Sequence, residues 1–312
     1  VARDSLLKVL SQGERRALYI LNILFEIETR RKQGATNILV VDDIADSFDY
    51  KNKYAIIEYL KDIASSGQFL CIFLSHNFDF YRSISGRLGL RRDCKLHAAK
   101  TGRKLKLVQE KYQKNPFNHW KDNLTTPAFC ISAIPFVRNL AEYCGLEAEF
   151  LKLTSLLHVK GDTDTMTLDQ LCTIYKKILA DKQQLALNPQ AKPVIELINE
   201  EAEAVFAAQE EAVELEGKIV LSIAIRLLAE RHMIRTINNA AFVGAITENQ
   251  TIKLLQEYKR LGLGRAEDVL VLEQVNLMTP ENIHLNSFMY EPILDLGIAH
   301  LKALYLDVKQ LP

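Results

Sequence analysis

Three short polar elements near the N-terminus have the residue types of a nucleotide site. The turn Leu10-Ser11-Gln12-Gly13-Glu14 precedes a long stretch with helical periodicity. Asp42-Asp43 follows an apolar run, and Ser75-His76 follows another one. The start of a helix presents unpaired backbone N–H groups and a partial positive charge, which suit a phosphate group. Taken alone, the serine of the turn is more simply a helix N-cap.

A second group of chemically useful residues lies in the later part of the chain. Arg138 and Glu142 are four residues apart, and His158 follows sixteen residues after Glu142. A histidine and a carboxylate can exchange protons with the 2′-hydroxyl and the leaving 5′-oxygen of RNA, and an arginine can neutralise the charged phosphate between them. Such a set fits a metal-independent ribonuclease whose product is a 2′,3′-cyclic phosphate. The simpler alternative is an i,i+4 ion pair worth a few tenths of a kcal/mol.

Apolar periodicity predicts the elements that position the first group. Short apolar runs predict buried strands, and longer stretches with a spacing of three or four predict helices. Alternation of the two predicts an α/β unit with a largely parallel sheet. The predicted elements are a helix at 14–31, strands at 37–41 and 69–74, a helix at 53–65 and a late edge strand at 104–108.

The texture of the sequence changes after about Tyr112. A polar stretch with two prolines predicts a linker at 112–128, so we expect an N-terminal domain at 1–111 and a mainly α-helical domain at 129–312. His158 lies near the end of the second predicted helix, whose return would bring it near Arg138 and Glu142. The predicted helices cover 129–144, 147–158, 168–180, 194–233 with breaks, 251–262 and 293–308.

Composition narrows the class of protein. Lys+Arg and Asp+Glu both number 39, so the net charge is zero, which argues against a strongly basic nucleic-acid coat but leaves room for a local basic site. Five scattered cysteines with no C-x-x-C predict reduced thiols in a cytoplasmic protein. No apolar run reaches the roughly 18 residues of a membrane-spanning helix, so no membrane association is expected.

The stretch Val40–Asp49 (VVDDIADSFD) resembles the Walker B motif and D-loop of ABC-type ATPases. By that resemblance Asp42 helps to hold Mg²⁺, and Asp43 stands where a glutamate usually polarises the attacking water. Asp49 matches the D-loop aspartate, which contacts the opposing protomer. His76 matches the switch histidine, which contacts the γ-phosphate of ATP.

The turn at Leu10–Glu14 resembles the signature motif of the same ATPases, in which one protomer closes on the nucleotide of another. The resemblance implies the C-terminal half of a P-loop ABC ATPase head, with Ser11, Gln12, Gly13 and Glu14 as nucleotide-binding residues acting on a partner's ATP. No G-x-x-x-x-G-K-[ST] occurs in the chain. We therefore expect the phosphate-cradling loop to come from elsewhere, a homodimer with ATP sandwiched between heads, and weak ATP binding by this chain alone.

An ABC-type ATPase followed by a helical domain with R-x₃-E and a downstream histidine resembles the PrrC/RloC group of bacterial anticodon nucleases. Arg138, Glu142 and His158 match that pattern, and the nuclease part of the group belongs to the HEPN ribonuclease class. The resemblance implies an antiphage protein that cleaves tRNA, with the nucleotide state of the heads switching the nuclease. An accessory defence protein is a further possible partner.

Other interpretations of the helical domain remain open. Arg226, Arg231 and His232 form a second candidate nuclease set, or with Arg235 a site for an RNA backbone, or a solvated helix face. Lys160 is a candidate phosphate contact. The domain is alternatively a sensor or docking module for a separate effector, with no nuclease activity of its own. A third hypothesis is a DNA-repair ATPase of the SMC kind.

Overall fold

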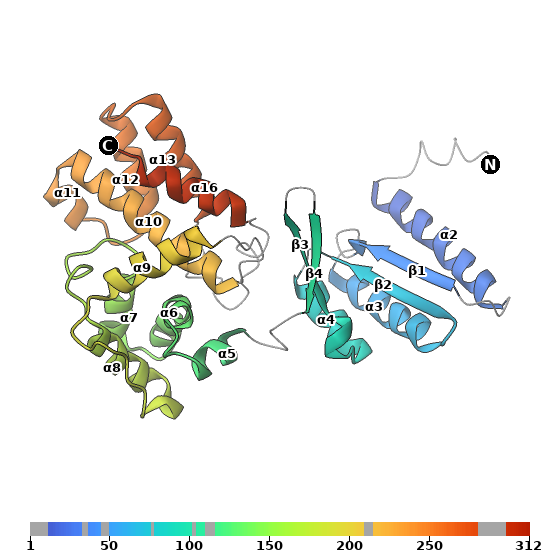
Figure 1. The fold of residues 1–312 in the computed structure, drawn as a ribbon. Coiled ribbons are helices and arrows are strands. Elements are labelled where there is room, and N and C mark those ends of the chain that lie inside the picture. Colours follow the sequence, from blue (N-terminus) through green and yellow to red (C-terminus); the bar gives the residue numbers. More distant parts are fainter. Residues whose placement is uncertain are drawn as a thin grey trace. The chain divides into compact units, whose positions relative to one another are not determined.

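The computed structural model describes residues 12–32, 37–44, 50–75, 78–101, 104–109, 116–208, 215–279 and 298–312. The chain divides into two compact units, Val1–Lys95 and Leu96–Pro312. The first unit is mixed α/β with a small sheet, and the rest of the chain is mainly helical (Figure 1). This confirms the α/β-then-α order that the sequence predicts.

The first unit is built on two parallel strands. Strand β1 (Asn37–Asp42) pairs with β2 (Phe69–Leu74) in parallel, with a register that runs from Asn37 opposite Phe69 to Asp42 opposite Leu74. Both strands were predicted from their apolar runs, and their parallel pairing from the alternation of strands and helices. Helices α2 (Gln12–Lys32), α3 (Tyr50–Ser65) and α4 (Phe78–Leu88) and a short 3-10 turn, η2 (Arg92–Cys94), complete the unit.

The two faces of the β1–β2 sheet differ sharply. On one face, alternate side chains of both strands, such as Leu39, Val41 and Phe69, pack against apolar residues of α2, α3 and α4. On the other face the side chains are large, apolar and between 47% and 70% exposed: Ile38, Val40, Leu70, Ile72 and Leu74. The alternation follows directly from the two-residue period of a strand. Among the described residues of the first unit, helices therefore cover only one face of the sheet.

A β-hairpin opens the second unit. Strand β3 (Leu96–Thr101) pairs antiparallel with β4 (Lys104–Gln109), from Leu96 opposite Gln109 to Thr101 opposite Lys104. The strand predicted at 104–108 is confirmed, whereas β3 was not predicted. The hairpin falls with the helical residues and not with the first unit, so the division of the chain comes earlier than the predicted boundary at residue 111.

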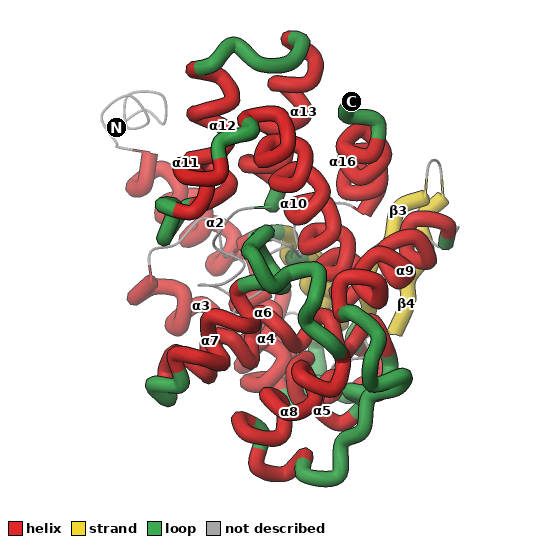
Figure 2. Tube along the Cα trace, turned by 90° about the vertical axis from the view of Figure 1, so that its left-hand side faces the viewer, coloured by secondary structure: helices red, strands yellow, loops and turns green. Residues whose placement is uncertain are grey.

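The rest of the second unit is helical, with loops between the helices (Figure 2). Helix α10 lies at its centre and packs against α6, α9, α12, α13 and α16 (Figure 1). Almost every residue of α10 is buried, as expected of a helix surrounded by others. The elements are α5 (Pro116–Asp122), α6 (Pro127–Tyr143), α7 (Glu147–Thr154), α8 (Leu168–Ile178), η3 (Ala180–Lys182), α9 (Val194–Ala207), α10 (Leu215–Ile237), α11 (Ala240–Gly244), α12 (Gln250–Arg260), α13 (Ala266–Met278) and α16 (Ile298–Lys309).

Part of the predicted linker is structured. Residues Pro116–Asp122 form α5, and its Phe117 and Trp120 are buried in the core of the helical unit. The polar composition around them concealed these two large aromatic side chains, which are three residues apart. Within the part of the chain that the structure describes, no helix has both the length and the apolar character needed to cross a membrane.

Candidate functional site

The carboxyl edge of the β1–β2 sheet brings the predicted acidic pair close to the end of β2. Asp42 pairs across the sheet with Leu74, and the backbone N–H of Asp43 donates to the Leu74 carbonyl oxygen over 3.0 Å. Ser75 follows immediately. Polar residues from two neighbouring parallel strands thus meet at one edge, which is where ligands bind in open α/β sheets.

Asp43 has an unusual backbone conformation. Its φ is +44°, in the left-handed region that aspartate visits more readily than most residues. Such conformations cluster at ligand-binding and catalytic turns. Asp42 is exposed beside it. Among the described residues, no group of three or more His, Cys, Asp or Glu side chains could hold a metal ion. The Mg²⁺ role of Asp42 therefore stays a prediction, and it is compatible with two carboxylates because Mg²⁺ takes few of them and keeps several waters.

The other predicted nucleotide residues divide into two groups. Ser11, Asp49 and His76 lie outside the described residues. Gln12, Gly13 and Glu14 form the first turn of α2, so the helix begins within the predicted signature turn at Leu10–Glu14. The backbone of the turn's second half therefore agrees with a helix start, while the roles of all six residues stay predictions.

Arg138, in α6, is held against α7. Its Nε donates to Thr154 Oγ1 over 2.8 Å and its Nη1 to Asn139 Oδ1 over 3.2 Å. Its guanidinium carbon lies 4.0 Å from the centre of the Phe150 ring, a cation–π contact. Burial lowers the pKa of Arg138, and the charge of Glu142 on the same helix opposes this shift. Glu142 itself is exposed.

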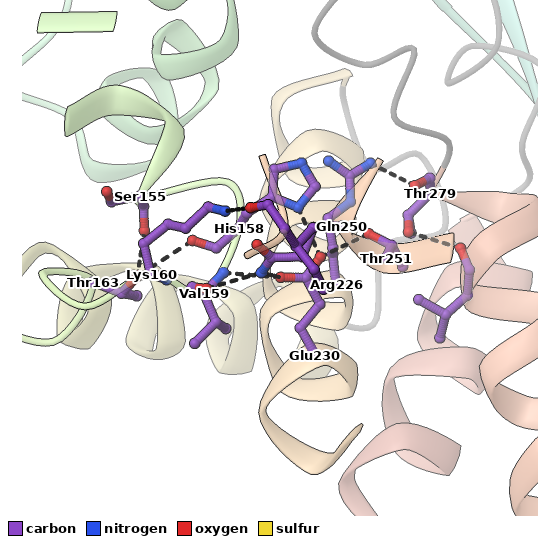
Figure 3. A network of polar contacts seen from close by, with 12 residues as sticks. Ser155, His158, Val159, Lys160, Thr163, Arg226, Glu230, Gln250, Thr251 and Thr279 are labelled. Carbon is purple, nitrogen blue, oxygen red and sulfur yellow. Dashed lines mark hydrogen bonds and ion pairs between the residues drawn. The ribbon is translucent and has the colours of Figure 1, made fainter. Parts of the chain in front are cut away.

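His158 follows α7 and pairs with a residue that the sequence did not single out. Its Nδ1 lies 2.7 Å from Oε1 of Glu230, which comes from the centre of α10 (Figure 3). Both side chains are buried, and that of Glu230 is fully so. A carboxylate at Nδ1 fixes the orientation and tautomer of an imidazole and stabilises its protonated form. Thr154 links the two candidates, because its hydroxyl accepts from Arg138 and its carbonyl from the backbone N–H of His158.

The carboxylate of Glu230 accepts three more hydrogen bonds. Thr251 Oγ1 donates to Oε1 over 2.7 Å, while Gln250 Nε2 and the backbone N–H of Val159 donate to Oε2 over 2.7 and 2.9 Å. Burial by itself raises the pKa of Glu230. The charge of His158, its hydrogen bond and those of Thr251 and Val159 outweigh this and hold the pKa below its ordinary value. The network joins α10, α12 and the segment after α7.

Two positively charged side chains, Lys160 and Arg226, lie near His158 and Glu230 (Figure 3). Lys160 is partly buried, and its Nζ donates to the Ile246 carbonyl over 3.1 Å. Burial lowers the pKa of Lys160, and Glu230 opposes the shift. Arg226, one helical turn before Glu230, is 1% exposed and donates to the Thr279 carbonyl. A histidine, a carboxylate, a lysine and an arginine therefore share one polar cluster inside an apolar unit.

The second candidate set does not form a solvated helix face. Arg226 is buried, and Arg231 forms an ion pair with Asp164. His232 Nδ1 lies 3.0 Å from the Pro312 carbonyl oxygen and its Nε2 3.1 Å from the Tyr258 hydroxyl. Arg235 also donates to the Pro312 carbonyl. His232 and Arg235 thus hold the C-terminal Pro312 against α10. Both follow Glu230, the partner of His158, along the helix.

Glu230 is the residue that sequence reasoning missed. The signal was the spacing of Ser222, Arg226 and Glu230, three polar residues four apart in an apolar stretch of the helix, which places them on one stripe. Its partner His158 is 72 residues away in the chain, and no local pattern predicts such a contact. The chain matched no protein-family model, no curated protein and no solved structure.

Proposed function

We propose that the first unit is one half of a composite ATP site and that the helical unit is a ribonuclease which that site controls. The observation that carries the proposal is the edge of the parallel β1–β2 pair. There, Asp42-Asp43 and the end of β2 lie side by side, with Asp43 in a left-handed turn. The order of these features along the chain agrees with the resemblance to ABC-type ATPases.

The acidic pair would supply the metal and water chemistry of the composite site. Asp42 would hold Mg²⁺, which neutralises phosphate charge when bound. Asp43 would orient and deprotonate the attacking water. Its side chain is one methylene shorter than the usual glutamate, so we expect slow hydrolysis. A slow rate suits a protein that is regulated by its nucleotide state more than one that performs mechanical work.

The exposed apolar face of the β1–β2 sheet supports the proposal that another part of the ATPase head packs on it. Parallel sheets are covered on both faces in stable proteins. Val40, Ile72 and their neighbours leave one face of β1–β2 apolar and exposed. We propose that the part of the head bearing the phosphate-cradling loop covers this face and extends the sheet, whether it lies on the same polypeptide or on another one.

The helical unit would cleave RNA by acid–base chemistry. Glu142 would take the proton of a 2′-hydroxyl while the 2′-oxygen bonds to phosphorus. The bond from phosphorus to the 5′-oxygen would break, with His158, oriented by Glu230, giving a proton to that oxygen. Arg138 would neutralise the charged phosphate. The products are a 2′,3′-cyclic phosphate and a 5′-hydroxyl, so neither water nor metal is consumed in the step.

ATP hydrolysis by the native assembly tests the composite site. The chain is tagged in its own host, purified with whatever partners it retains, and assayed for ATPase activity. Asp43→Asn should lower the rate by about 10²–10⁴-fold, the usual value of a general base. Asp62→Asn, at an exposed position on α3, is the matched control. Equal rates for the wild type and Asp43→Asn would overturn the proposal.

The burial of the polar cluster favours a second candidate function, that of a sensor or docking module. Glu230 and Arg226 are almost completely inaccessible, and Arg138 is already engaged by Phe150 and Thr154. These are the properties of a structural network, which suits a sensor or docking module acting through a separate effector. The discriminating measurement is whether the chain alone yields 2′,3′-cyclic phosphate ends from total tRNA, and whether His158→Ala abolishes them.

A further inference from the structure

The β3–β4 hairpin is the most basic regular element outside the sites described above. Residues 96–109 contain four Lys or Arg and no Asp or Glu, in a chain whose net charge is zero. Within the described part of the chain, Lys104 and Lys106 form no ion pair, and both are exposed. Lys104 and Lys106 therefore present positive charge that no carboxylate of the described residues pairs with.

The register of the hairpin places Lys104 and Lys106 on the face opposite its leucines, whereas Lys100 pairs with Leu105 on the leucine face. Residues directly opposite each other in an antiparallel pair share a face, and the face alternates along each strand. Lys104 and Lys106 therefore lie on one face, opposite Thr101 and Ala99. Leu105 and Leu107 lie on the other face together with Leu96, and these three leucines are more than half exposed.

The amphipathic pattern fixes which face is available to a ligand. A lone two-stranded ribbon is marginal in water and needs its apolar face covered. Once protein covers the leucine face, the face that bears Lys104 and Lys106 points away from that cover. His97, opposite Val108, lies on the same face, and burial followed by the charge of Lys218 lowers its pKa.

We propose that the lysine face of the β3–β4 hairpin binds the sugar–phosphate backbone of single-stranded RNA. Lys104 and Lys106 are two residues apart on one strand, which separates them by about 7 Å. Two flexible ammonium groups at that separation can each reach a different phosphate of an extended strand. Lysine binds phosphate as a point charge and reads no sequence, so the hairpin holds the RNA and leaves its selection to other residues. This inference rests on the proposed RNA substrate but not on cleavage.

Binding is tested with an RNA that cannot be cleaved through its 2′-hydroxyl. The probe is a fluorescent 2′-O-methyl oligonucleotide of about 20 nucleotides, longer than the roughly 4–16 that a single-strand site covers. Fluorescence anisotropy is measured with the whole 312-residue chain in a series of salt concentrations. The test variant is Lys104→Glu with Lys106→Glu. The matched control is Lys32→Glu with Lys152→Glu, two exposed lysines elsewhere that make the same change in net charge.

The test variant should bind about tenfold more weakly or worse, and the slope of log affinity against log salt should shrink by about 1.4, the value of two single-strand phosphate contacts. The control should keep both the affinity and the slope. Circular dichroism establishes that both variants are folded. No binding by the wild-type chain, or equal losses in the two variants, would overturn the proposal. If the wild-type chain binds RNA through the hairpin but does not cleave it, the proposed ribonuclease is rejected and the proposed RNA contact of the hairpin stands.

Discussion

Replacing Glu230 should destabilise the helical unit more than replacing any exposed carboxylate. Its fully buried carboxylate receives hydrogen bonds from Thr251, Gln250 and the Val159 backbone and pairs with His158. Glu230→Ala removes this partner from three buried side chains and from the partly buried Val159 N–H. Removing one partner of a buried charge pair costs about 3–5 kcal/mol, and we expect this range for the free energy of unfolding.

Glu230→Gln refines the prediction. The amide keeps the shape of the side chain and one acceptor oxygen, but its NH₂ group faces donors that the second carboxylate oxygen used to satisfy. We expect a loss of about 2–3 kcal/mol, since unsatisfied buried donors cost about 1–3 kcal/mol each and the backbone relaxes in part. The expected order of stability is wild type, then Glu230→Gln, then Glu230→Ala.

Urea unfolding monitored by tryptophan fluorescence measures these changes in stability for the helical unit alone. The chain has one tryptophan, Trp120, which is completely buried in the helical core. Its emission therefore reports on the helical unit and not on the α/β unit. Glu142→Ala, at an exposed position of α6, is the control and should change little. If Glu230→Ala and Glu142→Ala were equally stable, the network would not stabilise the unit as argued.

Further predictions concern the packed arginine, a buried histidine, and the bare sheet face. Arg138→Ala and Arg138→Lys should both lower the midpoint of Trp120-monitored urea unfolding, because neither restores the planar stacking on Phe150; an unchanged midpoint for the lysine variant would show that charge alone suffices. The pKa of His232 is lowered chiefly by burial, so its contribution is complete above about pH 6.5 and is lost as pH falls from there; stability measured from pH 8 to 5 should fall less in His232→Gln. Val40→Thr with Ile72→Thr should reduce the fluorescence of a bound hydrophobic dye while leaving thermal unfolding nearly unchanged, and undiminished dye binding would argue that the dye site is elsewhere.

Glu230 also predicts a dependence of stability on pH. Its pKa is lower in the folded chain than in the unfolded one, so its contribution is fully present above about pH 4.3 and is lost as pH falls through the folded-state value. Unfolding measured between pH 6 and 3 should show this loss in the wild type. Glu230→Gln should show a shallower fall over the same interval, and parallel curves would contradict the assignment.

Local periodicity was enough to predict much of the fold. The apolar runs at 37–41 and 69–74 predicted both strands, and their alternation with helices predicted the parallel pairing. The runs also predicted burial on both faces, but within the described residues one face is exposed. Strand β3 escaped because Leu96–Thr101 contains neither an apolar run nor a clear alternation. Helix α5 escaped because its polar, proline-flanked sequence conceals Phe117 and Trp120, whose burial depends on distant helices.

The candidate sites were predictable only in part. Asp42-Asp43 is a local feature, and its place at the edge of the sheet followed from the strand before it. The partner of His158 was not local. Glu142 was the expected carboxylate because of its spacing from Arg138, whereas the structure pairs His158 with Glu230 through tertiary packing. Long-range contacts of this kind come from the fold as a whole and leave at most an indirect trace, here a polar stripe on a buried helix.

The central claim is that an ATP site in the first unit controls RNA cleavage in the second. It is tested most directly by measuring tRNA cleavage by the native, tagged assembly with and without ATP, for the wild type, Asp43→Asn and His158→Ala. The account predicts 2′,3′-cyclic phosphate ends whose yield from the wild type changes with ATP, no cleavage by His158→Ala, and an altered ATP response in Asp43→Asn. Cleavage that is the same in all three proteins and indifferent to ATP would contradict it.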